Sequence, residues 1–142
     1  MLSMDAVVTC FSIACQLNGV SFDKSQVLHQ FSASGTTLTN TELQQASLSL
    51  GLKCKVKAYS RQFHQHEMPL PAILKTKKGD VCLVVKSELY EECQKRYLVQ
   101  YPNEEQPRIL TSQELDDVIP VEIIFIQLGA KEAIARKFDI RI

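Results

Sequence analysis

The sequence predicts a single α+β domain in which N-terminal helices pack on an antiparallel β-sheet. Its 142 residues, 45% of them hydrophobic with only 5 Gly and 5 Pro, have the size and composition of one compact domain with its own core. Apolar residues recur at helical spacing in the first third of the chain and alternate with polar residues after residue 51. The later segments are joined by short turns, and strands connected in this way run antiparallel.

Three helices are expected before residue 52. The first carries apolar side chains around most of its surface and ends at Gly19, so it is expected to be mostly buried. The second has a single apolar stripe. The third opens with Thr39 and Glu42, which have the spacing of a capping box, and ends at Gly51. The expected helices cover residues 5–18, 23–31 and 39–51.

The remainder of the chain reads as strands with one short helix. Residues 60–70 are expected to form a loop, and 77–80 a turn between two strands of a hairpin. A second capping-box spacing opens a short helix over 111–118. The expected strands cover residues 52–58, 70–75, 81–86, 96–101 and 121–128.

The charge balance gives no reason to expect a nucleic-acid partner. Sixteen Lys and Arg offset 16 Asp and Glu, so the chain has no net positive field to attract phosphates. The first residues lack the pattern of a secretory signal. The longest apolar run, 121–128, is much shorter than the about 20 residues that cross a bilayer, so no transmembrane helix is expected within these residues.

The cysteines indicate a reducing compartment. Their number is odd and no two have the CxxC spacing, which argues against a disulfide framework and a zinc knuckle. Two of them lie on different sides of the first helix, where a free cysteine usually packs as a small hydrophobe. The five are Cys10, Cys15, Cys54, Cys82 and Cys93.

A cysteine-bearing helix before an antiparallel sheet is similar to the arrangement in papain-type cysteine peptidases. Six segments follow one another in order along the chain: DAVVTCFSIACQLNGVSFD, TLTNTELQQASLSLGLKCK, LPAIL, GDVCLVV, RYLVQYP and ARKFD. This ordered set resembles the peptidase C39 family, in particular the C39-like N-terminal domain of haemolysin-exporter-type ABC transporters of type I secretion. The resemblance implies a papain-like fold over 1–129 and a tail, 130–142, that leads towards the first transmembrane helix of the parent transporter.

The same resemblance implies that the catalytic triad is degenerate. Active members open the first helix with Asp-Cys-Gly, place a His after the glycine turn, and place an Asp before a proline. In this chain the three positions carry Ala6, Val81 and Tyr101. Thiol attack needs a thiolate, a base and a group that orients the base, so we expect no catalytic residue here.

Members with this loss act as docking modules, so the resemblance implies a catalytically inactive domain that binds unfolded export substrate, an RTX-type toxin or adhesin. It implies a place on the cytoplasmic face of the bacterial inner membrane. It also implies no cofactor in this domain, with ATP and Mg bound by the parent transporter's nucleotide-binding domain. The further partners implied are the transporter's own membrane and nucleotide-binding domains and, indirectly, membrane-fusion and outer-membrane proteins.

The substrate-binding residues expected in the former catalytic cleft are Ala6, Val81 and Tyr101, with aromatic surface added by Tyr59 and Tyr97. The tyrosines could equally cap the core, and the binding surface could lie on another face. Two other functions stay open. The domain could be an active peptidase that uses Cys10 to cleave leader peptides, or a regulatory module that contacts the nucleotide-binding domains.

Two polar features have simpler interpretations. His64 and His66, beside Glu67, could hold a metal, but no further His or CxxC pair supports this, so we expect an exposed polar loop and no metal site. A group of lysines reads as a solvated strand face, or alternatively as a basic surface for acidic substrates. These are Lys53, Lys55 and Lys57, with Lys75, Lys77 and Lys78 near them in the expected sheet.

Overall fold

The computed structural model describes residues 5–91 and 94–129 and confirms the α+β fold. The expected tail, 130–142, lies outside the described residues. Three helices come first: α1 (Ala6–Leu17), α2 (Lys24–Phe31) and α3 (Asn40–Ser49). Then follow β1 (Leu52–Ala58), the 3-10 helix η1 (Arg61–Gln65), β2 (Ala72–Thr76), β3 (Val81–Glu91), β4 (Gln94–Gln100), β5 (Arg108–Thr111), α4 (Ser112–Asp117) and β6 (Pro120–Leu128).

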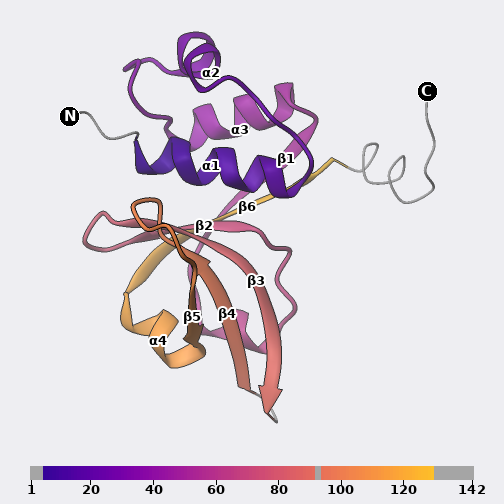
Figure 1. The fold of residues 1–142 in the computed structure, drawn as a ribbon, viewed down its shortest axis with the longest axis vertical. Coiled ribbons are helices and arrows are strands. Elements are labelled where there is room, and N and C mark those ends of the chain that lie inside the picture. Colours follow the sequence, from indigo (N-terminus) through magenta and orange to yellow (C-terminus); the bar gives the residue numbers. More distant parts are fainter. Residues whose placement is uncertain (1–4, 92–93, 130–142) are drawn as a thin grey trace.

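The strands form one six-stranded sheet in the order β1-β6-β2-β3-β4-β5, and every neighbouring pair is antiparallel (Figure 1). Helices α1, α2 and α3 cover one face, where they share a hydrophobic cluster with β1, β6, β2 and β3. Helix α4 and η1 contribute to a second cluster on the other face. The sheet therefore separates two cores.

Helix α1 is buried as its apolar surface predicts. Val8, Phe11 and Cys15 are fully buried, and the rings of Phe11 and Phe22 pack with centroids 5.3 Å apart. Asp5 is the N-cap of the helix: its carboxylate accepts a hydrogen bond from the backbone N–H of Val8 at 3.1 Å. None of the helices in the described ranges is long and apolar enough to cross a membrane.

Strands β2 and β4 begin two residues away from their expected starts, and three elements differ more from the sequence expectation. Strand β3 continues to residue 91 instead of ending at 86, and β5 and η1 were not predicted. The extension of β3 is mostly exposed, so its side chains lack the alternation that marks a half-buried strand. Strand β5 is only four residues long and mostly exposed. The 3-10 turn falls within the segment 60–70, which was expected to be a loop.

We expect Phe11→Ala to lower the free energy of unfolding by about 3–5 kcal/mol, because truncating a fully buried ring leaves a cavity beneath α1. Chemical denaturation followed by circular dichroism measures the change. The matched control is Leu48→Ala on α3, where the side chain is 79% exposed and the change should be below about 0.5 kcal/mol. Equal effects of the two substitutions would contradict the assignment of Phe11 to the core.

Candidate functional site

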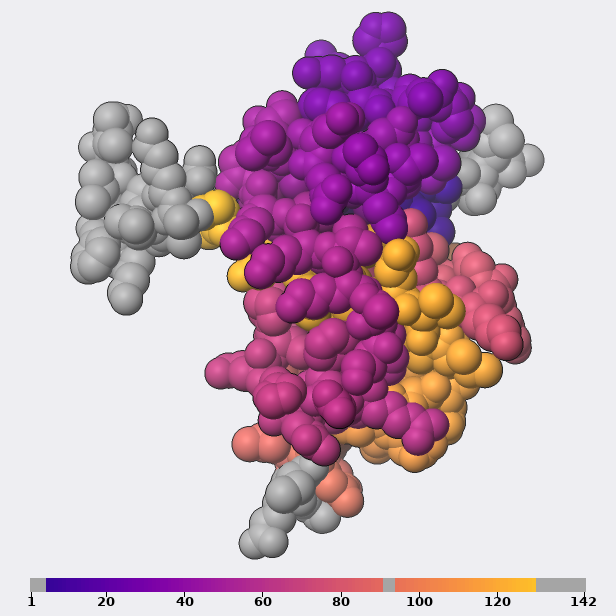
Figure 2. All heavy atoms as spheres, turned by 180° about the vertical axis from the view of Figure 1, so that it is seen from behind, coloured from indigo at the N-terminus to yellow at the C-terminus, as the bar shows by residue number. Residues whose placement is uncertain are grey.

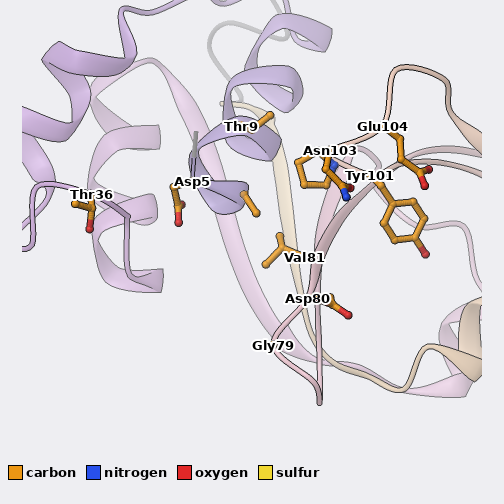
Figure 3. Close-up of a pocket in the computed structure, with 11 residues that line it drawn as sticks. Asp5, Thr9, Thr36, Gly79, Asp80, Val81, Tyr101, Asn103 and Glu104 are labelled. Atoms are coloured by element: carbon orange, nitrogen blue, oxygen red, sulfur yellow. The ribbon is translucent and has the colours of Figure 1, made fainter. Parts of the chain in front are cut away.

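A cleft of about 980 Å³ opens where the N-terminus of α1 meets the start of β3 and the loop after β4 (Figure 3). Strands β3 and β4 are antiparallel neighbours with Leu83 opposite Gln100, so the start of one and the end of the other share one end of the sheet. Helix α1 packs across β3 and β2 and brings its own first turn to the same place. The lining residues are Asp5, Ala6, Thr9, Thr36, Gly79, Asp80, Val81, Tyr101, Pro102, Asn103 and Glu104.

The three positions that the sequence resemblance assigned to the degenerate triad all line this cleft. Ala6 is the first residue of α1, Val81 is the first residue of β3, and Tyr101 directly follows β4. In the close-up, Val81 lies between Asp5 and Tyr101 in the view (Figure 3). The structure thus brings together positions that are far apart in sequence, while their role in binding substrate stays a prediction.

Two carboxylates and a tyrosine hydroxyl are among the polar groups of the cleft. One carboxylate oxygen of Asp5 already caps α1 and also accepts a hydrogen bond from the hydroxyl of Thr37 at 2.8 Å. The carboxylate of Glu104 accepts two hydrogen bonds from the guanidinium of Arg108. Burial raises the pKa of the Tyr101 hydroxyl, which therefore stays protonated at neutral pH. None of the lining residues is a cysteine or a histidine.

Cys10, the alternative nucleophile, lies inside the core. It is fully buried, and desolvation together with the nearby Cys82 and Asp5 raises the pKa of its thiol to about 12. Cys15 is buried as well, and its pKa is likewise raised to about 12, first by desolvation. The expectation that both thiols pack as small hydrophobes is confirmed, because a protonated thiol without access to solvent is a poor nucleophile.

The other two tyrosines lie away from the cleft. Tyr97 is fully buried in the second cluster, so the prediction that it adds aromatic surface for a substrate is wrong. Tyr59 is half-buried and packs against the same cluster. Both tyrosines therefore pack against the core, which is the alternative interpretation that the sequence left open. Burial is also the main reason why the pKa of Tyr97 rises to about 12.

His64 is not part of an exposed loop, which corrects the sequence expectation. The turn η1 carries it into the second cluster, where its side chain is only 13% exposed. Its Nδ1 lies 2.7 Å from the hydroxyl of Tyr97 and its Nε2 2.8 Å from the carboxylate of Asp116. The Tyr59 hydroxyl donates to the same carboxylate at 2.7 Å. These partners are 33 and 52 residues from His64 in sequence, so no local pattern signals the cluster.

The remaining loop residues, His66 and Glu67, are exposed as expected. In the ranges 5–91 and 94–129, no three His, Cys, Asp or Glu side chains gather closely enough to hold a metal ion.

The predicted basic surface divides into separate parts. Lys53, Lys55 and Lys57 are exposed along β1. Lys75 lies two strands away, and its Nζ donates a hydrogen bond to the side chain of Asn40 on the helical face of the sheet, so a single surface that includes Lys75 is wrong. The exposed row on β1 remains as a strand face in solvent.

The fold and the cleft define an α+β domain of cysteine-peptidase type, in which a helix packs on an antiparallel sheet with the cleft at the helix N-terminus. The sequence model of the peptidase C39 family matches residues 1–127. The chain therefore belongs to the peptidase C39 family. Among curated proteins the comparison found no match.

The fold is shared by several solved structures, including these three. The N-terminal peptidase C39 like domain of the toxin secretion ATP-binding protein from Vibrio parahaemolyticus has a TM-score of 0.69 at 17% identity, covering 90% of this chain and 100% of that one. A double glycine motif protease from an AMS/PCAT transporter, in complex with the leader peptide, has a TM-score of 0.69 at 11% identity, covering 91% of this chain and 88% of that one. The peptidase domain of Streptococcus ComA, a bi-functional ABC transporter involved in quorum sensing, has a TM-score of 0.68 at 11% identity, covering 91% of this chain and 96% of that one.

We expect the Cys10 thiol to resist alkylation at pH 8, because it is fully buried and its pKa is raised to about 12. The measurement is the rate of iodoacetamide labelling, with the modified cysteine identified by peptide mass spectrometry. A cysteine introduced at the exposed position 48, Leu48→Cys, serves as the reactive control and should label at least tenfold faster. Equal labelling rates would show that Cys10 is accessible.

We expect Asp116→Ala to lower the free energy of unfolding by about 1–3 kcal/mol at pH 7, because it removes the acceptor of His64 and Tyr59. Asp117→Ala, at an exposed position on the same helix, is the control and should cost much less. Burial raises the pKa of Asp116, but the hydrogen bonds from His64 and Tyr59 outweigh it, so the pKa lies below its usual value.

A carboxylate whose pKa is lowered in the folded state contributes stability above its unfolded pKa of about 4, and this stability is lost as the pH falls through the folded value. The difference between the wild type and Asp116→Ala should therefore shrink in denaturation series taken towards pH 2. A difference that stays constant with pH would mean that the charge of Asp116 does not contribute.

Proposed function

We propose that this chain is a docking domain without peptidase activity, part of an ABC exporter of type I secretion, and that it holds an unfolded segment of the export substrate in the cleft. The observation that carries the proposal is the lining of the cleft by Ala6, Val81 and Tyr101. The cleft lies at the N-terminus of α1, where a helix end would favour a thiolate, yet no thiol or imidazole lines it.

An extended polypeptide suits this cleft. Its volume of about 980 Å³ is at the upper end of the range for small-molecule sites. Ala6, Val81 and the ring of Tyr101 give apolar contacts, while Asn103 and Thr9 offer polar groups to peptide N–H and C=O. Such a mixture binds a chain through its backbone and a few apolar side chains, as an unfolded substrate requires.

The transporter context comes from the family and from the similar structures. Each of the three is a domain or protease of a transporter or of a toxin secretion protein, and one of them holds a leader peptide. We propose the same class of ligand, a peptide segment of exported protein, for this chain. The parent protein would then bind ATP and Mg in a separate nucleotide-binding domain and place this domain at the cytoplasmic face of the bacterial inner membrane.

The alternative of an active peptidase is less well supported. Its nucleophile would be Cys10, whose thiol is buried and has a raised pKa, and no histidine lies in the cleft to accept a proton. Thiol attack needs both groups within hydrogen-bond reach of one another.

We expect an RTX repeat polypeptide, kept unfolded by a Ca²⁺ chelator, to shift the amide NMR signals of Ala6, Val81 and Tyr101. Val81→Glu should weaken the binding about tenfold, because it places a buried charge against the apolar segment of the ligand. Leu48→Glu, on the exposed face of α3, is the control and should leave the affinity unchanged. Saturating polypeptide that leaves the cleft signals unmoved would contradict the proposal.

The same samples test for cleavage with a double-glycine leader peptide, followed by mass spectrometry. We expect no product from the wild type or from Ala6→Cys, because no histidine lines the cleft to take the thiol proton and to pass it to the leaving amine. Cleavage by the wild type that disappears in Cys10→Ala would establish the peptidase instead.

A further inference from the structure

Strand β1 is an edge of the sheet and pairs with β6 alone. The bonds from Tyr59 N–H to Val121 O and from Gly129 N–H to Gly51 O, each 3.0 Å, fix which backbone groups face β6. Because hydrogen-bonded positions alternate in an antiparallel ladder, odd-numbered residues of this stretch face β6 and even-numbered ones face outward. The outward N–H and C=O groups belong to Leu52, Cys54, Val56 and Ala58.

A row of lysines runs along this edge. Lys53, Lys55 and Lys57 are all exposed on one face of β1, and the residues opposite them on β6 are uncharged. Within the part of the chain that the structure describes, no carboxylate pairs with any of the three. Seen from behind, the magenta segment that contains β1 lies at the molecular surface (Figure 2). Three like charges thus stand beside free backbone hydrogen-bonding groups.

We propose that the outer edge of β1 binds an extended acidic segment of the export substrate as an added strand. The inference rests on the proposed docking function and assigns a second contact to it, away from the cleft. Successive lysines are about 6.8 Å apart, because they are two residues apart in a strand. An added strand with Asp or Glu at alternate positions has the same spacing, so each carboxylate lies opposite a lysine.

The other side chains of the added strand would lie beside Cys54 and Val56. Both are half-buried against α3 and leave apolar surface at the edge. The sequence that fits is therefore an alternation of acidic residues with small apolar or β-branched residues. Backbone hydrogen bonds supply affinity, and the lysine row supplies the selection for acidic chains.

A second copy of this chain is a poor occupant of the edge. Two β1 strands paired with each other would place lysines of one opposite lysines of the other, and like charges directly opposite are destabilising. Lysines on an edge strand also prevent pairing with neutral strands. The charge that prevents these contacts is the charge that an acidic strand neutralises.

The cleft and this edge are separate sites. Strands β6 and β2 lie between β1 and β3, so an added strand at β1 leaves the cleft residues free. The two contacts can therefore be perturbed one at a time.

The test titrates a short synthetic peptide that alternates Glu with Thr and Val into the domain, with NMR detection. We expect shifts of the amide signals of Cys54 and Val56, slower amide hydrogen exchange at both, and weaker binding as salt is raised. The double variant Lys53→Glu/Lys55→Glu should weaken binding at least tenfold. The control Lys77→Glu/Lys86→Glu, with the same charge change at exposed positions on other elements, should weaken it by less than threefold.

Other outcomes overturn the inference. If both double variants weaken binding of the peptide equally, the peptide is held by general charge attraction. If the amide signals shift but hydrogen exchange at Cys54 and Val56 does not slow, the peptide contacts the lysines without forming a new strand. Equal binding of a peptide with Lys in place of Glu would remove the charge selection. If the RTX polypeptide binds the cleft while the acidic peptide leaves β1 unchanged, the inference fails and the docking function stands. If neither ligand binds, both fail.

Discussion

The burial of α1 against the sheet is the constraint on which the rest of the structure depends. The helix has apolar side chains on most sides, so it has to be enclosed between the sheet and the other helices rather than lie on the surface. Its axis fixes where its first turn falls, and the hydrogen bonds of Asp5 tie that turn to Thr37. The cleft exists because a helix held in this way meets the end of the sheet where β3 begins and β4 ends.

The same packing explains why position matters more than residue type for the chemistry of this domain. A thiol one helical turn into α1 is enclosed by the core and keeps its proton, whereas a residue at the first position of the helix faces the cleft. Cysteine is present in the helix but absent from Ala6 and Thr9, the two positions of α1 that line the cleft. Under the proposed docking function, Ala6, Val81 and Tyr101 serve as contact side chains in this cleft.

The sequence predicted what depends on local periodicity. The helical spacing in 5–18, the alternation in 52–58 and the capping box at Thr39 each reflect a single element with one buried face, and each appears in the structure. The convergence of Ala6, Val81 and Tyr101 was accessible because the family resemblance supplied the fold. The His64 cluster was not, because its hydrogen bonds join residues from η1, β4 and α4 and no periodicity links them. Strand β5 is too short and too exposed to show a pattern.

The strand order has a consequence for how the chain acquires this structure. Strand β6 is the last to be synthesised, yet it lies between β1 and β2, and it pairs residue 52 with residue 128. During translation β1 has no strand to pair with until β6 has been synthesised. The sheet surface on which α1 packs is incomplete until the same point. Contacts of such high sequence separation are slow to form, since the entropy of closing the loop is lost before any pairing stabilises it. We therefore expect the sheet, and with it the burial of α1, to be completed only after β6 has been synthesised.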